Sequence, residues 1–147
     1  MSSRMNIFQQ APEVVKAMMG VETSLKKGGL ESELVELVKV RASQINGCAF
    51  CIHMHVTDAL KAGESDMRLL LLNGWRESSF FSDRERAALA WTETLTTVSE
   101  TGAPDEDYKL LESLFSEKEI AYLTLLVGTI NLWNRVQIGT RAIHPAQ

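Results

Sequence analysis

The sequence has few of the residues that interrupt helices and no clear signal for strands. Among 147 residues there are three prolines, at positions 12, 104 and 145, and no alternating apolar and polar run of useful length. Apolar residues instead recur every three or four positions, as they do in amphipathic helices. The sequence therefore predicts an all-α fold.

Long apolar stretches are also missing. Residues 1–10 contain no sustained apolar region of the kind found in signal peptides, and the apolar stretch 120–133 is interrupted by threonine, glycine and asparagine. A membrane-spanning helix needs about 20 consecutive apolar residues. We therefore expect no secretion, no membrane insertion and a cytoplasmic location.

Charges of one sign do not gather along the chain. The net charge of -4 arises from 15 basic and 19 acidic residues that are interspersed, without a basic run to neutralise a nucleic-acid backbone. We expect no role with DNA or RNA. With 45% apolar residues, the chain can bury one core but is short for two, which predicts a single domain over residues 1–147.

Turn and capping signals divide the chain into about six or seven helices. Gly47 and Gly63 stand where a left-handed residue would end a helix, and two Ser-x-x-Glu capping boxes begin at Ser82 and Ser116. Helices are predicted from Pro12 to Leu25, 33–46, Cys48 to Lys61, 67–72 and 105–115, and after the two capping boxes.

The only two cysteines lie three residues apart at the predicted start of a helix. Cys48, Cys51 and His55 share one helical face, whereas His53 lies well away from it. A helix N-terminus and a nearby imidazole both favour the thiolate, which is the form that attacks a peroxide oxygen. The second thiol can then resolve the sulfenic acid as a disulfide. This arrangement predicts a two-cysteine redox site.

Two alternatives to the redox site remain open. The cysteines can be small buried core residues. They can also form a structural zinc site with His55, although no second Cys/His pair is present to complete four ligands.

Glu36 is a further candidate on the preceding predicted helix, in a segment that is apolar on several sides. A carboxyl group there can accept or relay a proton through an imidazole such as His55. The alternative is a solvated Glu36 that pairs with Lys39 three residues later.

The segment from Glu36 to His55 resembles the core signature of the AhpD-like alkylhydroperoxidases in the carboxymuconolactone decarboxylase family. The resemblance extends from about Leu30 to the end of the chain. It implies an AhpD-like helical domain and an oxidoreductase that reduces hydroperoxides with a dithiol or protein reductant, without a cofactor. It also implies a homo-oligomer, a trimer or hexamer, which agrees with helices such as 120–130 that are apolar on more than one face.

The resemblance assigns roles to four residues. It implies that Glu36 and His55 relay protons, that Cys51 becomes the sulfenic acid and that Cys48 resolves it, whereas the helix N-terminus by itself favours Cys48 as the nucleophile. This chain has Phe50 where the best-studied peroxidase type carries a histidine directly before the second cysteine. Two other functions stay open: a non-enzymatic redox-sensing or thiol-disulfide partner protein, and a lactone decarboxylase, although such decarboxylases generally lack the cysteine pair.

Several polar residues near the signature have structural explanations. Arg41 and Ser43 are expected to support the end of their helix. Asn131, Asn134 and Arg135 lie on an otherwise apolar final helix, where buried hydrogen bonds to loops or to a neighbouring subunit explain them better than a place in a pocket.

Overall fold

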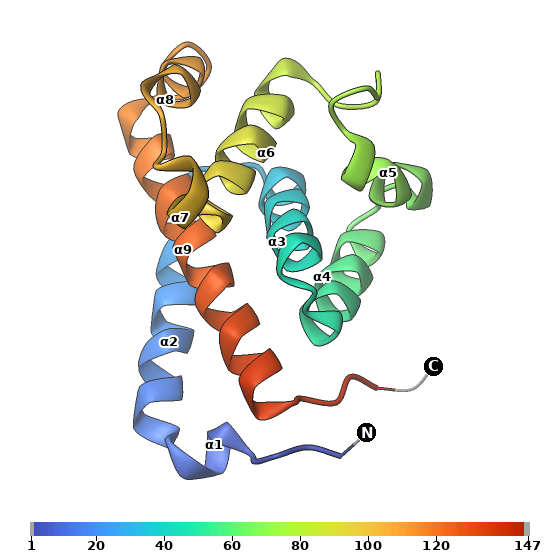
Figure 1. Cartoon of the computed structure of the whole chain (residues 1–147), viewed down its shortest axis with the longest axis vertical. Coiled ribbons are helices and arrows are strands. Elements are labelled where there is room, and N and C mark those ends of the chain that lie inside the picture. Colours follow the sequence, from blue (N-terminus) through green and yellow to red (C-terminus); the bar gives the residue numbers. More distant parts are fainter. Residues whose placement is uncertain (1, 146–147) are drawn as a thin grey trace.

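The computed structural model describes residues 2–145, which fold into helices joined by short turns (Figure 1). In chain order the elements are α1 (Ile7–Gln10), α2 (Pro12–Leu25), α3 (Ser32–Asn46), α4 (Ala49–Lys61), α5 (Asp66–Leu71), the 3-10 helix η1 (Leu72–Gly74), α6 (Asp83–Thr96), α7 (Val98–Thr101), α8 (Asp105–Glu112) and α9 (Glu117–Thr140). These residues contain no β-strand, so the predicted all-α fold is confirmed.

The number of helices is slightly larger than the predicted six or seven. Two of the nine α-helices found within residues 2–145, α1 and α7, have only four residues each. One turn is too short to show a helical period in the sequence, so these two helices gave no signal. Helix α8 also ends at Glu112, three residues before its predicted end.

Helix α3 is the central element of the fold and packs against α4, α6 and α9 (Figure 1). Leu34 and Val38 face one apolar cluster, which α6, α8 and α9 complete. Leu37 and Val40 face a second cluster, shared with α4, α5 and α6. Because its apolar residues lie on two sides, α3 is held between the two clusters, and this fixes the position of the helix that carries Glu36.

Local capping signals set the ends of the long helices. Ser82 and Ser116 each accept a hydrogen bond from the backbone of the glutamate three residues later, whose carboxylate bonds back to the serine N–H. Both predicted capping boxes are thus confirmed. Gly47, at φ 69°, ends α3 in the left-handed conformation as predicted.

The N-terminal segment reaches the far end of the last helix. Helix α2 packs along α9, and the first and last of the described residues, 2 and 145, lie at the same end of the molecule (Figure 1). The Arg4 N–H donates to the Thr140 carbonyl over 2.9 Å. This contact holds the segment before α1 against the end of α9.

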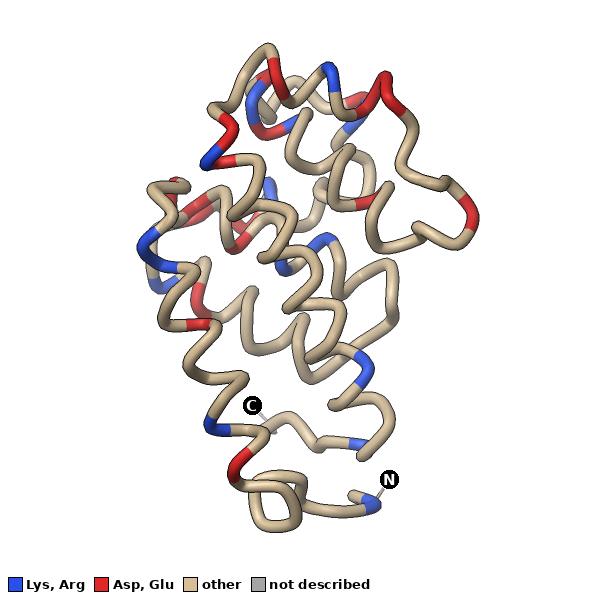
Figure 2. The backbone as a smooth tube through the Cα atoms, turned by 90° about the vertical axis from the view of Figure 1, so that its left-hand side faces the viewer, with Lys and Arg blue, Asp and Glu red and all other residues tan. Residues whose placement is uncertain are grey.

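Basic and acidic residues lie next to one another over the molecule (Figure 2). Arg84, for example, pairs with Glu31 and Glu119, and Arg68 pairs with Glu64 and Glu85. Every helix in the described residues is too short or too polar to cross a membrane.

Candidate active site

The corner between α3 and α4 places the two cysteines. After the left-handed Gly47, the chain turns and the Cys48 N–H donates to the Ser43 carbonyl over 3.0 Å. Cys48 is the N-cap of α4, and its Sγ accepts from the Cys51 backbone N–H at 3.4 Å. The thiol pair therefore stands at a helix start, as the sequence predicted, with Cys48 as the cap and Ala49 as the first helical residue.

Both thiols are free and almost completely enclosed, since each cysteine is 1% exposed. They share a hydrogen bond, and this bond is the main reason that the pKa of Cys48 falls to about 7, ahead of the backbone donors at the helix start and the Asn134 amide. The same bond and burial raise the pKa of Cys51. In the reduced protein the negative charge therefore rests mainly on Cys48, in line with the stabilisation of anions at helix N-termini.

His55 joins the thiol helix to a carboxylate on α3. Its Nδ1 lies 2.9 Å from Oε2 of Glu36, and the imidazole is buried whereas the carboxylate is half-buried. The expected alternative partner of Glu36 is engaged elsewhere, because Nζ of Lys39 donates to Glu22 over 2.9 Å. The predicted pairing of Glu36 with Lys39 is therefore wrong. Glu36 contacts His55 instead, as the other interpretation required.

A cavity of about 410 Å³ opens beside these residues. Cys51, His55 and Glu36 contribute its polar inner wall. Most of the remaining surface of the cavity is apolar and comes from Phe8, Met19, Phe50, Met54 and Trp133. Four charged residues and one amide also line it: Glu22, Lys26, Lys39, Asp58 and Gln137. Within the described chain, Cys51 belongs to this lining and Cys48 does not. Cys51 is therefore the sulfur that a molecule in the cavity would meet.

Sequence reasoning missed the contribution of the N-terminal helices to this cavity. Phe8 and Met19 lie far from the signature in the chain and come to the cavity only through the packing of α2 on α9. Such a contact leaves no local pattern in the sequence. The apolar character of both residues was the only available sign, and it equally fits a core position.

His53 lies apart from the thiols, as its position on the helix predicted. Its ring stacks on that of His144, with 5.1 Å between the ring centroids. This contact attaches the segment after α9 to the outer side of α4.

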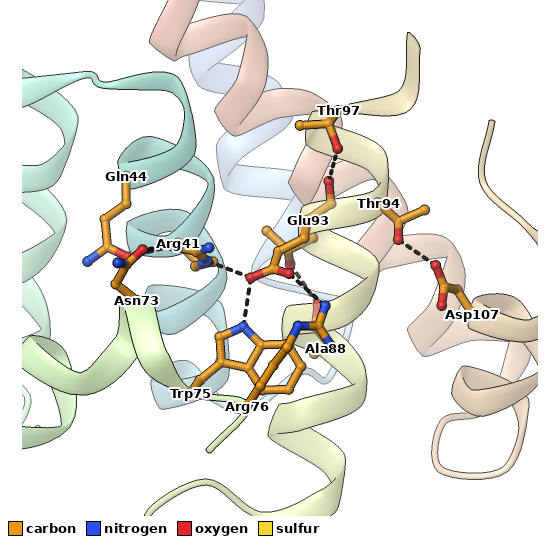
Figure 3. Close-up of polar contacts among 11 residues, drawn as sticks. Arg41, Gln44, Asn73, Trp75, Arg76, Ala88, Glu93, Thr94, Thr97 and Asp107 are labelled. Carbon is orange, nitrogen blue, oxygen red and sulfur yellow. Dashed lines mark hydrogen bonds and ion pairs between the residues drawn. The ribbon is translucent and has the colours of Figure 1, made fainter. Parts of the chain in front are cut away.

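Arg41 takes part in a cluster of polar contacts around Glu93 (Figure 3). Its Nε donates to Glu93 Oε1 over 2.8 Å, and the same carboxylate accepts from Trp75 and Arg76. The expected structural role holds, but the partners are side chains rather than neighbouring carbonyls: Gln44 on α3, Asn73 on η1 and Glu93 on α6.

The asparagines of α9 form a buried polar network with the end of α3. Nδ2 of Asn46 donates to Oδ1 of both Asn131 and Asn134, over 2.9 and 2.8 Å. The expected buried hydrogen bonding is confirmed, but the partner is α3 of the same chain and not a loop or a neighbouring subunit. Polar residues spaced by three on an apolar helix were the signal for it.

A structural zinc site was one of the two alternatives to a redox role for the cysteines. The described residues contain no group of three or more His, Cys, Asp or Glu side chains that could hold a metal ion.

Taken together, these features define an all-helical protein with a buried C-x-x-C pair at a helix start and a His–Glu pair beside it. The chain belongs to the carboxymuconolactone decarboxylase family, whose model matches residues 12–94. Its fold is the AhpD-like helical fold.

Two relatives and one solved structure are especially similar. The uncharacterized protein YdfG of Bacillus subtilis (strain 168) is 41% identical over 144 residues, which cover 97% of this chain and 98% of YdfG. The uncharacterized protein YnjA of Escherichia coli (strain K12) is 33% identical over 108 residues, 73% of this chain and 58% of YnjA. A protein of unknown function from Agrobacterium tumefaciens, suggested to be the antioxidant defence protein AhpD, has a crystal structure with a TM-score of 0.96 and 42% identity, covering 99% of this chain and 100% of its own.

Proposed function

We propose that this protein is a thiol peroxidase that reduces organic hydroperoxides or hydrogen peroxide without a metal or haem cofactor. Four side chains carry the reaction: Cys48, Cys51, His55 and Glu36. The observation that supports this most is that one cavity exposes a thiol and an imidazole together, while the imidazole is bonded to a carboxylate and the thiol to a second thiol.

The first step forms a sulfenic acid on Cys51. The two thiols together give up one proton to His55, where Glu36 stabilises the imidazolium at 2.9 Å. The remaining proton moves within the shared hydrogen bond from Cys51 to Cys48, which leaves Cys51 as the thiolate. The Cys51 thiolate attacks the terminal oxygen of the hydroperoxide. The S–O bond forms, the O–O bond breaks, and the departing alkoxide takes the proton from His55.

The second step closes a disulfide. The Cys48 sulfur attacks Cys51, the S–O bond breaks, and the hydroxide leaves with the Cys48 proton as water. Two thiols and one hydroperoxide thus give a disulfide, an alcohol and water. An external dithiol or protein reductant then restores both thiols.

Two properties of the sulfurs favour different nucleophiles. The lowered pKa of Cys48, due first to its bond with Cys51, favours that sulfur as the thiolate. The cavity favours Cys51, because it lies in the wall beside His55. Access decides the assignment: a proton can move along one hydrogen bond, whereas a hydroperoxide cannot reach a sulfur that the cavity does not touch. We therefore assign the attack to Cys51.

The lining of the cavity supports an organic hydroperoxide as the preferred substrate. Phe8, Met19, Met54 and Trp133 supply apolar surface around the polar wall, and Phe50 adds to it where the related peroxidase type has a histidine. Burial of an organic group against this apolar surface makes its binding more favourable. Hydrogen peroxide has no apolar group and does not benefit in this way.

The decisive test is the consumption of an organic hydroperoxide by the reduced protein with a dithiol present in excess. We expect sustained turnover and, without the dithiol, one equivalent of peroxide consumed with a mass loss of two hydrogens. The double variant Cys48→Ser/Cys51→Ser is the control. Disulfide formation without turnover by any of several dithiols would contradict the peroxidase and favour a redox-sensing partner protein.

We also propose that the chain works as a single domain in the cytoplasm, where thiols remain reduced, and that it assembles into a homo-oligomer. Leu125 and Leu132 support the assembly, since they lie two turns apart on the outer side of α9 and are 59% and 46% exposed. Neither has a partner element in the fold that explains an apolar side chain at that position.

A further inference from the structure

A lysine in the wall of the cavity beside the thiols carries a buried charge. Lys39 comes from α3, one turn after Glu36, and only 10% of its side chain is exposed. Its Nζ donates to Oε2 of Glu22 on α2 over 2.9 Å, while Oε1 of the same carboxylate accepts from Nε1 of Trp133 over 3.1 Å. Because α2, α3 and α9 all take part in these two bonds, the ammonium of Lys39 is held in a defined place.

The fold does not use all the hydrogens of this ammonium. Lys39 carries three N–H groups at Nζ, and the bond to Glu22 is the only hydrogen bond that they make within the described residues. Lys39 lines the cavity of about 410 Å³ that Cys51 also lines, and a neighbouring cavity of about 370 Å³ as well. The remaining N–H groups can therefore bind a molecule that lies in either cavity.

The two cavities share a wall of charged residues from three helices: Glu22 and Lys26 from α2 and its end, Glu36 and Lys39 from α3, and Asp58 from α4. In the reaction proposed above, Glu36 faces an imidazolium, so its charge is balanced. The side of the wall formed by α2 and α3 then has two lysines for one glutamate. This side carries one unbalanced positive charge, whereas Asp58 makes the α4 side negative.

This charge, together with the rest of the lining, indicates what the wall binds. A carboxylate carries a single negative charge, and its hydrogen bonds to an ammonium are stronger than those between neutral groups. A phosphate group carries more charge than the wall balances. Most of the other lining is apolar, and Cys51 lies in the same cavity as Lys39. An acid group, an apolar chain and a hydroperoxide on one molecule therefore each find a matching surface.

We propose that Lys39 and Lys26 form a carboxylate subsite, and that the preferred substrates are hydroperoxides of carboxylic acids with an apolar chain. Lys39 supplies the fixed donor, and Lys26, which is exposed, supplies a second cation from the end of α2. The substrate class rests on the peroxidase function proposed above. Binding of the acid group does not, because it requires the two lysines and no reaction at sulfur.

Isothermal titration calorimetry of the full-length variant Cys48→Ser/Cys51→Ser tests the subsite without turnover. One ligand is ω-hydroxyoctanoate, the kind of alcohol that the reaction would leave. The other is its methyl ester, which has the same chain but no charge. We expect the acid to bind about tenfold more tightly than the ester, since a hydrogen bond to a charged group contributes about this much.

Three lysine substitutions in this background locate the effect. Lys39→Met should remove the preference for the acid, and Lys26→Met should lower it about threefold, as for an exposed charge. Lys26→Met leaves the bond between Lys39 and Glu22 in place, so its effect cannot come from a released Glu22. Lys27→Met is the matched control, because it removes the same charge one residue away and Lys27 lines neither cavity.

Equal binding of acid and ester, an unchanged preference in Lys26→Met, or an equal decrease in Lys27→Met would overturn the subsite. Lys26→Met decides the question if Lys39→Met does not fold, as judged by circular dichroism. Turnover is measured separately: the parental protein should consume ω-hydroperoxyoctanoate with a higher kcat/KM than its methyl ester. Tighter binding of the acid by a protein that consumes neither hydroperoxide would overturn the peroxidase function and leave the subsite standing.

Discussion

In the proposed reaction, the imidazole of His55 links the two enclosed thiols to the carboxylate of Glu36. It is buried on α4, and its only carboxylate contact in the described structure crosses to Glu36 on α3. A carboxylate at 2.9 Å from Nδ1 fixes the ring orientation and leaves the other ring nitrogen free to exchange protons in the cavity. In the proposed reaction, the chemistry of the thiols therefore depends on Glu36, whose hydrogen bond goes to His55 and not to a sulfur.

Replacing Glu36 with glutamine tests this dependence. The amide keeps the size of the side chain but cannot stabilise the imidazolium, so we expect peroxide turnover to fall about tenfold, less than the loss of a direct acid–base group. Steady-state turnover and circular dichroism measure activity and fold separately. Glu33→Gln, on an exposed position of the same helix, is the control. Parental turnover in Glu36→Gln would return Glu36 to a structural role.

The identity of the attacking sulfur can be read from two single variants. In Cys48→Ser, Cys51 still faces the cavity but cannot be resolved, so one dose of peroxide should leave a sulfenic acid on Cys51 that a dimedone-type reagent traps. In Cys51→Ser no rapid sulfenic acid should form. Mass spectrometry of the labelled peptides distinguishes the two. Fast labelling of Cys48 in Cys51→Ser would mean that the helix N-terminus outweighs access through the cavity.

At the scale of elements, the tight corner between α3 and α4 decides where the thiols lie. Gly47 has a φ of 69°, and a Cβ added there would meet no atom within 4 Å. Any cost of a side chain at this position is therefore a cost of backbone conformation and not of space.

Gly47→Ala should accordingly destabilise the protein by about 1–2 kcal/mol, because the left-handed conformation disfavours a Cβ. Gly20 is a matched control: it lies inside α2 and a Cβ there also meets nothing within 4 Å. Gly20→Ala should stabilise the helix by about 0.5–1 kcal/mol. Denaturant unfolding of both variants measures the two free energies. A change of the same sign in both would contradict the conformational explanation.

The four longest helices around the core, apart from α2, were the most predictable elements, because local signals specify their ends. Helices α3 and α4 end at Gly47 and Gly63, and helices α6 and α9 begin at capping boxes. The contact between Glu36 and His55 is different. It joins two helices, so the spacing of residues could only make it plausible, and the resemblance to a family singled it out. The closure of the cavity by Phe8 and Met19 had no local signal at all.

At the scale of the molecule, α9 carries more apolar surface than its own chain covers. Its inner side contributes Leu123, Leu126, Val127 and Ile130 to the core, whereas Leu125 and Leu132 face outwards. Gly128 lies between the two leucines and has open space around it, so another helix can approach the backbone closely there. A helix that is apolar on two sides is typical of one buried on two sides.

We therefore expect the protein to be an oligomer at micromolar concentration, with α9 at the interface. Light scattering of the parent should give a multiple of the 16.4 kDa chain mass. Leu125→Glu/Leu132→Glu should shift the protein toward the monomer, because a charge in a desolvated interface has no partner there. Leu70→Glu, which changes an even more exposed leucine on α5, should leave the mass unchanged. A parent that scatters as a monomer would refute the assembly. An oligomer that dissociates only in Leu70→Glu would instead move the interface from α9 to α5.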